Sequence, residues 1–353
     1  MKGFASISLT VVVCVLLTVV STYGQAAYRI SEPFTHKNLT IFLIHGADAS
    51  SNKDLITLEE ALKMKIFKVY ETEDVNELLV ENISPKYDVF IQSGDIVKGG
   101  KQDRVLAISV IIPRNSGKVS IEAFCVESDR WEGRGNESRK EFSSSEERVV
   151  SKELKIATNG TASESGSGSG GGIGNSNGAG RGSQTEVWKE VANAQKNISA
   201  NVTVDVTANS SRSSLQLSLE NKKLVKEREA FVKNLADLMK GKSDVIGYAF
   251  AINGKINSAD IYVSNHLFAK LWPKMLKAAV VEAISLADKE AAATQPNPGD
   301  INAFLLDAEK GEVNERPTVA KSKVVTRQTS TEAVYEARDR ADLVVHRNYV
   351  KLN

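Results

Sequence analysis

The segment Gly94–Arg104 combines glycines, cations and a carboxylate in an order that suits the binding of a polar ligand. Glycine permits unusual backbone angles and lets a ligand approach the main chain closely. Lys101 and Arg104 are candidate contacts for an anion, and Gln102 and Asp103 are candidates for fixing polar groups such as ribose hydroxyls. The alternative interpretation is a turn between two strands whose charges point to water.

A second segment, Cys125–Trp131, follows a predicted strand and carries a thiol, carboxylates and an arginine. It differs from the cysteine loop of phosphatases, because Arg130 lies one residue too close to Cys125. Glu127 and Asp129 would also repel a phosphate and would not lower the pKa of the thiol. The alternative is a strand end in which Cys125 packs in the core and Arg130 pairs with one of the carboxylates. No catalytic residue can be assigned from this segment.

Several familiar catalytic and cofactor motifs are missing from the sequence. It holds no G-x-x-x-x-G-K-[ST] loop, no H-E-x-x-H and no G-x-S-x-G. A G-x-G-x-x-G pattern starts at Gly166, but low-complexity sequence surrounds it where a nucleotide site needs a strand before and a helix after. The histidines lack helical ligand spacing: His36, His45, His266 and His346. We therefore predict no metal site and no cofactor.

Composition and the N-terminus bear on partners and compartment. The 353 residues contain 45 Lys plus Arg and 44 Asp plus Glu, so the chain lacks the basic excess of a nucleic-acid-binding protein. Lys2, the apolar run Ile7–Val20 and small residues up to Ala26 predict a secretory signal peptide, with an uncleaved anchor as the alternative. We expect a secreted or periplasmic protein with no membrane span after cleavage. Cys125 then remains alone, which excludes an internal disulfide.

Short β-branched and aromatic runs predict strands in the N-terminal half. These runs are Leu39–Ile44, Phe67–Glu71, Leu78–Asn82, Tyr87–Ile91, Val105–Ile112 and Lys118–Phe124. Thr57 and Glu60 form a capping-box pattern and predict a short helix. Turn residues between Pro113 and Gly117 predict a hairpin that joins the last two of these strands.

The C-terminal half begins after Ala157–Gln184, whose Gly and Ser content predicts a flexible loop. Asn253-Gly254 is the clearest hairpin signal, and Pro273 should kink or split the helix that contains it. Four helices are predicted. One starts at Ser183, and the other three cover Glu220–Lys240, Asn265–Ala287 and Ile301–Ala308. The predicted strands are Val202–Val206, Val245–Ile252, Lys255–Val263, Thr318–Thr326, Ala333–Ala337 and Leu343–Leu352. Without regular βα alternation, this order favours an α+β fold with largely antiparallel sheets and several packed helices.

The two central motifs resemble those of one family. Gly-Asp-x-x-Lys-Gly-Gly-Lys-Gln-Asp-Arg-Val at 94–105 and Cys-Val-Glu-x-x-Arg-Trp at 125–131 are similar to the ARG and rhodanese-phosphatase-superfamily-associated protein domain, where ARG means ADP-ribosylglycohydrolase. Weaker matches such as Thr57–Ala61 and Leu271–Lys274 extend the resemblance over about 39–286. The resemblance implies a link to ADP-ribose-processing and phosphatase-like proteins. The ligand-binding residues it implies are Gly94, Asp95, Gly100, Lys101, Gln102, Arg104, Cys125, Glu127, Arg130 and Trp131.

These observations divide the chain into a signal peptide at 1–26, a family-like domain at 27–290 that includes the 157–184 loop, and a strand-rich extension at 291–353. The first functional hypothesis is an exported ligand-binding or interaction protein whose site is formed by the two motifs, with an unknown small molecule or protein as ligand. The second is a hydrolase or transferase acting on an ADP-ribose-like or phosphorylated substrate. The third is a structural or assembly protein that pairs through its C-terminal strands.

Overall fold

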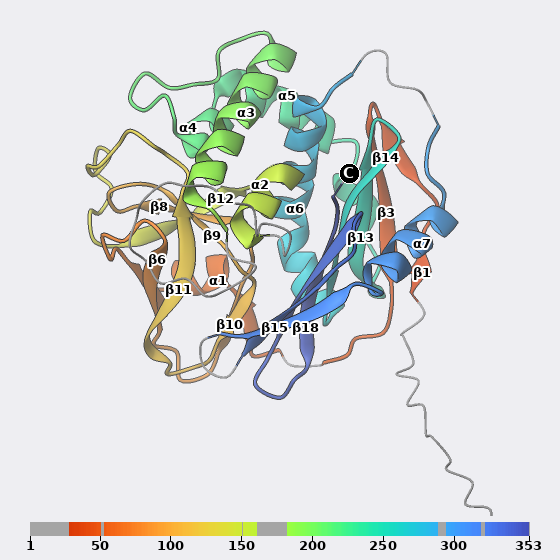
Figure 1. Cartoon of the computed structure of the whole chain (residues 1–353), viewed down its shortest axis with the longest axis horizontal. Coiled ribbons are helices and arrows are strands. Elements are labelled where there is room, and N and C mark those ends of the chain that lie inside the picture. The colour runs from red at the N-terminus through yellow and green to blue at the C-terminus, as the bar shows by residue number, and fades with distance from the viewer. Residues whose placement is uncertain are drawn as a thin grey trace, which may run out of the picture.

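A computed structural model describes residues 28–50, 53–149, 151–160, 182–288, 294–318 and 322–352. The predicted signal peptide and residues 161–181 of the predicted loop lie outside these ranges. The predicted α+β class with largely antiparallel sheets is confirmed (Figure 1). In the described part of the chain, no helix combines the length and apolarity needed to cross a bilayer.

The largest sheet has nine strands and is antiparallel throughout. Its order is β1 (Arg29–Ile30), β3 (Leu39–His45), β13 (Val245–Ile252), β14 (Lys255–Tyr262), β18 (Val344–Lys351), β17 (Glu332–Arg338), β16 (Lys323–Gln328) and β15 (Glu312–Pro317), with β2 (Phe34–His36) paired to β3. The hairpin at Asn253-Gly254 is confirmed, with φ of 52° and 75° at the two turn residues. Because β18 pairs with β14, the strands after residue 291 belong to the same sheet as the N-terminal β3.

Two smaller sheets form the other half of the molecule. The three-stranded sheet consists of β10 (Val110–Ile112), β7 (Asp88–Ile91) and β4 (Leu55–Thr57), with β4 parallel to β7. The six-stranded sheet has the order β12 (Phe142–Arg148), β8 (Asp95–Gly99), β9 (Arg104–Leu106), β11 (Gly117–Cys125), β6 (Glu77–Asn82) and β5 (Phe67–Tyr70).

The predicted strand Val105–Ile112 is wrong in one respect, because it breaks at 107–109 and its two pieces join different sheets. β9 pairs with β11, whereas β10 pairs with β7. The predicted hairpin holds in part: β9 pairs with β11, but β10, which directly precedes the turn, pairs with β7, so no tight hairpin forms across 113–117. Both pieces are buried and apolar from 105 on, so their pattern does not show the change of sheet. The break places Ser109 where the two sheets meet.

The helices are α1 (Leu58–Lys63), α2 (Lys152–Asn159), α3 (Gln184–Val202), α4 (Leu215–Leu219), α5 (Lys222–Val232), α6 (Asn265–Ser285) and α7 (Pro298–Ala308), with a 3-10 turn at Ala236–Met239. The capping box of α1 is confirmed, because Glu60 N donates to Thr57 Oγ1 at 3.2 Å and Thr57 N donates to Glu60 Oε2 at 2.9 Å.

Three predictions for this region are corrected. The helix predicted to end at Lys240 ends at Val232. Of the two outcomes predicted for Pro273, a split is excluded, because α6 continues through this residue. The expected loop begins later than predicted, since α2 extends to Asn159. No strand forms at 202–206, because α3 continues to Val202. The buried residues of α3 recur at helical spacing up to Val202. The free energy gained by burying this face outweighs the strand preference of the alternating valines at 202–206.

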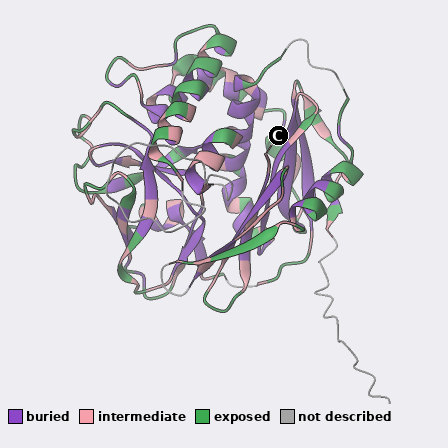
Figure 2. Ribbon diagram, in the orientation of Figure 1, coloured by how far each residue is buried: buried purple, intermediate pink, exposed green. Residues whose placement is uncertain are grey.

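α6 lies between the large sheet and the rest of the molecule (Figure 1). Phe268 and Trp272 pack with Tyr248 of β13, while Val281 belongs to the apolar cluster that contains Ile198 of α3. Figure 2 shows this helix and the strands around it as largely buried, whereas β15 is exposed. α7 covers the opposite face of the large sheet. Side chains from both halves therefore meet in the interior beside α6.

Candidate functional site

The structure brings the two sequence motifs together in one buried group, which we call the motif cluster. Its residues are Gln102, Asp103, Arg104, Cys125, Glu127 and Arg130. Arg104 of β9 and Cys125 of β11 face each other in register. Gln102 Nε2 donates to the Glu127 carbonyl at 2.8 Å, and Asp103 N donates to Glu127 Oε2 at 3.2 Å. Neighbouring strands thus position the motifs.

Arg104 is fully buried and joins three segments of chain. Its guanidinium donates to Glu71 Oε1 at 2.9 Å, to the Val75 carbonyl at 3.2 Å and to Cys125 Sγ. Burial raises the pKa of the Cys125 thiol to about 12, although the charge of Arg104 acts in the opposite direction. Cys125 is therefore a neutral thiol packed in the core, as one of the two sequence interpretations expected.

The acidic half of the motif cluster is held by two arginines. Arg130 Nη2 lies 2.8 Å from Glu127 Oε2, which confirms the pairing expected from the sequence. Arg134 Nη1 lies 2.9 Å from Asp103 Oδ2. Burial, followed by the negative charge of Glu127, raises the pKa of Asp103 to about 6 against the opposing charges of both arginines. These bonds fasten the chain after β11 to the β8–β9 turn.

The other motif residues near this turn lie at its rim. Lys101 Nζ pairs with Glu73 Oε1 at 2.9 Å. Gly100 has a φ of 58°, and a Cβ at this position would overlap the ring of Phe142, so the turn requires glycine. Trp131 is half exposed. The polar groups of the motif cluster are thus bonded to one another and to neighbouring protein groups such as Glu71 and Arg134.

Gly94 and Asp95 lie at the opposite end of β8, in the interior between the two halves. Gly94 has a φ of 88°, and a Cβ there would lie 3.0 Å from Nη2 of Arg148. That nitrogen donates to the Ser93 carbonyl at 2.5 Å. Asp95 Oδ1 lies 3.2 Å from Nζ of Lys274 on α6. The first motif therefore contributes to two separate centres.

The second centre, which the sequence did not predict, is a set of polar side chains that we call the central polar cluster. It consists of Ser93, Ser109, Asn159, Asp260, His346 and Asn348. Ser109 Oγ lies 3.1 Å from Nδ1 of His346, and Nε2 of His346 lies 2.9 Å from Asp260 Oδ1. Ser109 comes from the break between two sheets, whereas Asp260 and His346 come from the adjacent strands β14 and β18.

The charges around Asp260 assign the direction of these hydrogen bonds. Burial raises the pKa of Asp260, but the hydrogen bond from His346 and the nearby charges of Lys155 and Arg148 hold it below its ordinary value. Asp260 is therefore a carboxylate, and it accepts a hydrogen bond from the N–H at Nε2 of His346. In the tautomer that carries its hydrogen on Nε2, Nδ1 of His346 is an acceptor within reach of the Ser109 hydroxyl.

Further hydrogen bonds fix the serine end of the Ser109–His346–Asp260 series. Ser93 N donates to Ser109 Oγ at 3.0 Å, and Asn159 Nδ2 donates to Ser93 Oγ at 3.1 Å. Asn348 Nδ2 supports the other end, donating to Asp260 Oδ1 at 3.0 Å. The Ser109 hydroxyl can thus accept a hydrogen bond from the main-chain N–H of Ser93 while donating one to His346.

The same part of the interior contains an unusual amount of charge. Burial lowers the pKa of Lys155 against the charges of Glu282 and Asp260, and burial raises the pKa of Glu282. Asp260 Oδ2, Asn257 Oδ1 and Ser258 Oγ are buried without a hydrogen-bond partner in the described part of the chain. Perturbed titratable groups and unpartnered polar atoms are typical of functional sites.

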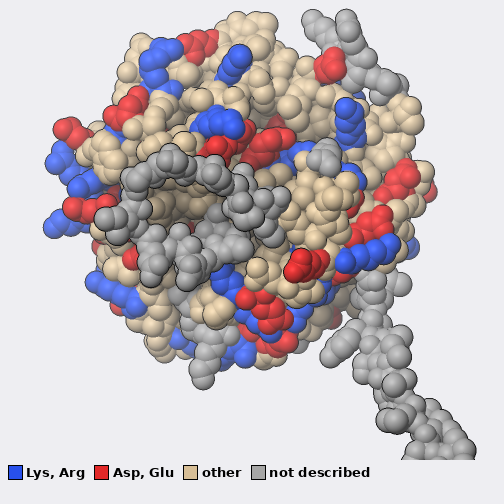
Figure 3. Space-filling view, in the orientation of Figure 1, with Lys and Arg blue, Asp and Glu red and all other residues tan. Residues whose placement is uncertain are grey.

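Three neighbouring cavities that share lining residues, which we call the funnel, extend to the central polar cluster. The narrow cavity has about 10 Å³ and is lined by Ser93, Ser109, Asn159, Val324, Tyr335, Glu336 and Asn348. It shares Asn159, Val324 and Tyr335 with a cavity of about 40 Å³. That cavity shares Ile108 and Arg316 with a wide cavity of about 1010 Å³. Figure 3 shows a hollow in the face that carries β11, a strand that lines the wide cavity.

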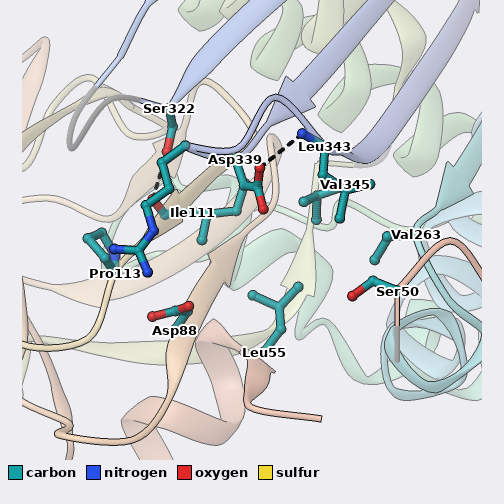
Figure 4. A pocket seen from close by; sticks show the side chains of 11 residues that line it. Ser50, Leu55, Asp88, Ile111, Pro113, Val263, Ser322, Asp339, Leu343 and Val345 are labelled. Atoms are coloured by element: carbon teal, nitrogen blue, oxygen red, sulfur yellow. Dashed lines mark hydrogen bonds between the residues drawn. The ribbon is translucent and has the colours of Figure 1, made fainter. Parts of the chain in front are cut away.

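A separate cavity of about 50 Å³ lies at a seam between β10 and the start of β18 (Figure 4). Its carboxylates already have partners within the chain. Asp88 accepts from Arg114 N at 2.9 Å, and Asp339 accepts from Leu343 N at 3.0 Å. This cavity lies at a junction between the two halves, and both of its carboxylates accept hydrogen bonds from the main chain.

Part of the central polar cluster had a signal in the sequence. Ser258, Asp260 and Tyr262 alternate with the apolar residues Ala259 and Ile261 along the second half of a buried strand. A carboxylate on the inward face of a buried strand needs a partner, which indicates a polar centre. Ser109 interrupts an apolar run in the same way, but nothing local pairs it with His346.

The state of Cys125 gives a direct prediction. In the folded full-length chain at pH 8, we expect iodoacetamide to leave Cys125 unmodified, because the thiol is buried and its pKa is raised to about 12. Peptide mapping by mass spectrometry distinguishes it from Cys14, and unfolding in urea should expose it. Rapid alkylation of Cys125 without unfolding would contradict this assignment.

The fold and its interior centre define an α+β protein whose two halves enclose a polar cluster at the end of a funnel. The chain belongs to the family of the ARG and Rhodanese-Phosphatase-superfamily-associated Protein domain, whose model matches residues 27–352. The match includes the C-terminal strands, beyond the extent of the resemblance seen in the motifs. Neither a curated protein nor a solved structure matches the chain.

Proposed function

We propose that this chain binds a small polar molecule in the funnel, with the central polar cluster at its narrow end. The main support for this proposal is that three cavities, which share lining residues, decrease in volume toward Ser109 and its polar neighbours. Ligand sites in proteins are commonly concave and present a few converging polar groups. The unpartnered oxygen of Asp260 and the buried charges nearby support a site that is completed by a ligand.

In this proposal the motif cluster supports the wall of the wide cavity. Arg104 donates to the carbonyl of Val75, whose neighbours Asp74 and Asn76 line the wide cavity. The main-chain groups of Cys125 exchange hydrogen bonds of 2.8 and 2.9 Å with the side chain of Gln184, another lining residue. The motif residues that we predicted as ligand contacts thus act mainly as buried support.

The lining charges favour a neutral or cationic ligand. The wide cavity is lined by Asp74, Glu77 and Glu122, and its guanidinium, from Arg316, already pairs with Glu122. Excess negative charge repels phosphates and attracts cations. The alternative that we drew from the sequence, an ADP-ribose-like or phosphorylated substrate, fits this lining less well.

Export is part of the same proposal and rests on the signal pattern at 1–26. We expect protein recovered outside the cytoplasm to begin after Gly24 or Ala26, as read by mass spectrometry of its N-terminal peptide. Recovery of the chain with its first residues intact, inside the cytoplasm alone, would contradict export.

The binding proposal is tested by calorimetry on the full chain with three probes: spermidine as a cation, N-acetylglucosamine as a neutral molecule and ADP-ribose as an anion. We expect binding of the cation or the neutral molecule. Ile108 lines both the wide and the middle cavity, so Ile108→Phe should obstruct the funnel and weaken binding at least about tenfold, or about 1.4 kcal/mol.

Leu306→Phe is the matched control, because Leu306 is exposed on α7, on the other face of the large sheet. It should bind as the wild-type chain does, and circular dichroism should show both variants folded. Equal binding by the Ile108 variant would place the ligand elsewhere. Preferential binding of ADP-ribose would overturn the charge argument, and no response to any probe would contradict a ligand site in the funnel.

A further inference from the structure

We propose that Ser109, His346 and Asp260 form a nucleophile, base and orienting carboxylate, and that the chain hydrolyses short-chain esters of polar molecules. The inference rests on the proposed function, because the ester would enter through the funnel. It adds a reaction to binding and assigns it to residues outside both sequence motifs.

The geometry meets the requirements for an activated serine. The hydroxyl of Ser109 lies within hydrogen-bond reach of Nδ1 of His346, and Asp260 holds the opposite nitrogen. The His346 ring is fixed in orientation by stacking on Tyr262 at a centroid distance of 4.7 Å. Ser109 also borders the narrow cavity, so a carbonyl group entering there reaches the nucleophile.

The first half of the reaction forms an acyl-enzyme. Ser109 Oγ attacks the carbonyl carbon of the ester, and its proton passes to Nδ1 of His346, giving an imidazolium that Asp260 stabilises. The ester C–O bond then breaks, and the departing alcohol oxygen takes the proton from Nδ1. The acyl group remains on Ser109 as an ester.

Water completes the cycle. A water molecule attacks the acyl carbon, and one of its protons passes to Nδ1 of His346. The bond from the acyl carbon to Ser109 Oγ breaks, the proton returns to Oγ, and the carboxylic acid leaves. No oxidant, reductant or cofactor enters this balance.

The funnel limits the substrate at both ends. The narrow cavity has about 10 Å³, which is roughly the space that one water molecule occupies, so it favours a small acyl group such as acetyl over a long chain. The wide cavity of about 1010 Å³ receives the alcohol part. Its negative lining selects a neutral or cationic alcohol, so the substrate class is an O-acetyl ester of such a molecule.

The test compares hydrolysis of 4-nitrophenyl acetate by the full-length wild-type chain and by variants. Ser109→Ala should lose about 10³-fold or more in kcat/KM. Ser218→Ala is the matched control, because Ser218 is also fully buried but lies in α4 and bonds to Gln195. We expect it to retain wild-type turnover. The wild-type chain should prefer the acetyl ester to 4-nitrophenyl octanoate at least about tenfold, a difference of about 1.4 kcal/mol.

A fluorophosphonate probe provides a second measurement that does not depend on turnover. Peptide mapping should place the label on Ser109 in the wild-type and Ser218 variant chains. No labelling of Ser109 in a folded chain, or equal hydrolysis by Ser109→Ala, would overturn the inference. If a probe ligand still binds in the funnel under those outcomes, the proposed function stands and the chain is a binding protein alone.

Asp260 acts through His346, so it is a positioning residue. In Asp260→Asn the new amide offers an N–H to Nε2 and favours the ring tautomer that carries its proton on Nδ1, which cannot accept from Ser109. We expect kcat to fall about 10³–10⁴-fold with KM little changed, and fluorophosphonate labelling of Ser109 to slow in parallel. A purely structural role would leave the labelling rate of the folded variant unchanged and would contradict this assignment.

Discussion

Arg104→Ala is expected to lower the free energy of unfolding by about 3–5 kcal/mol. The substitution leaves the Glu71 carboxylate, which is 4% exposed, without the guanidinium that lies 2.9 Å away. It also removes the hydrogen bond to the Val75 carbonyl and leaves a void beside Cys125. Urea denaturation followed by circular dichroism measures the loss. Because this residue supports the wall of the wide cavity, probe binding in the funnel should weaken as well.

Arg114→Ala is the matched control for this prediction. Arg114 also pairs with a carboxylate, with Nε 3.1 Å from Asp88 Oδ1, but its side chain is 34% exposed. We expect it to cost about 1 kcal/mol or less, as is usual for pairs near the surface. If both substitutions cost the same, the motif cluster would contribute no more to stability than a surface pair.

Phe268→Ala is the second substitution with a large expected effect, about 3–5 kcal/mol. Phe268 is fully buried on α6 and stacks on Tyr248 and Tyr262 at centroid distances of 6.0 and 5.4 Å. Alanine would leave a cavity where α6 packs on the large sheet. Thermal and urea unfolding of the variant measure the cost.

His266→Ala controls for effects of substitution in the same helical turn. His266 is exposed near the start of α6, so its replacement should change the free energy of unfolding by about 0.5 kcal/mol or less. A Phe268 variant as stable as the His266 variant would show that the aromatic packing between α6 and the sheet adds little.

The parts of the fold that depend on neighbouring residues were predictable from the sequence. Asn253-Gly254 marked its hairpin because both residues adopt positive φ there, and Thr57 with Glu60 marked the start of α1. The apolar period of 265–287 predicted α6 almost to its ends. In each case one local interaction accounts for the pattern.

Features decided by tertiary contacts were not predictable in this way. The break at 107–109 depends on which strands lie beside each piece, and the pattern is equally apolar on both sides. The contact between the two motifs follows from the pairing of β9 with β11, but the polar group of Ser109 and His346 joins residues 237 positions apart. The hydrophobic periodicity of a segment reports only on its neighbours in sequence and does not indicate which distant residue it will contact. The sequence signal for this centre is Asp260, because a carboxylate on the inward face of a buried strand requires a polar partner.

The order of these residues along the chain has a consequence for biosynthesis. His346 lies 237 residues after Ser109, on β18, whose pairing with β14 brings it beside Asp260. In the proposed reaction, a polypeptide still emerging from the ribosome, or still threading through a translocation pore, would lack the base that activates Ser109. It would hydrolyse no ester until β18 had paired with β14.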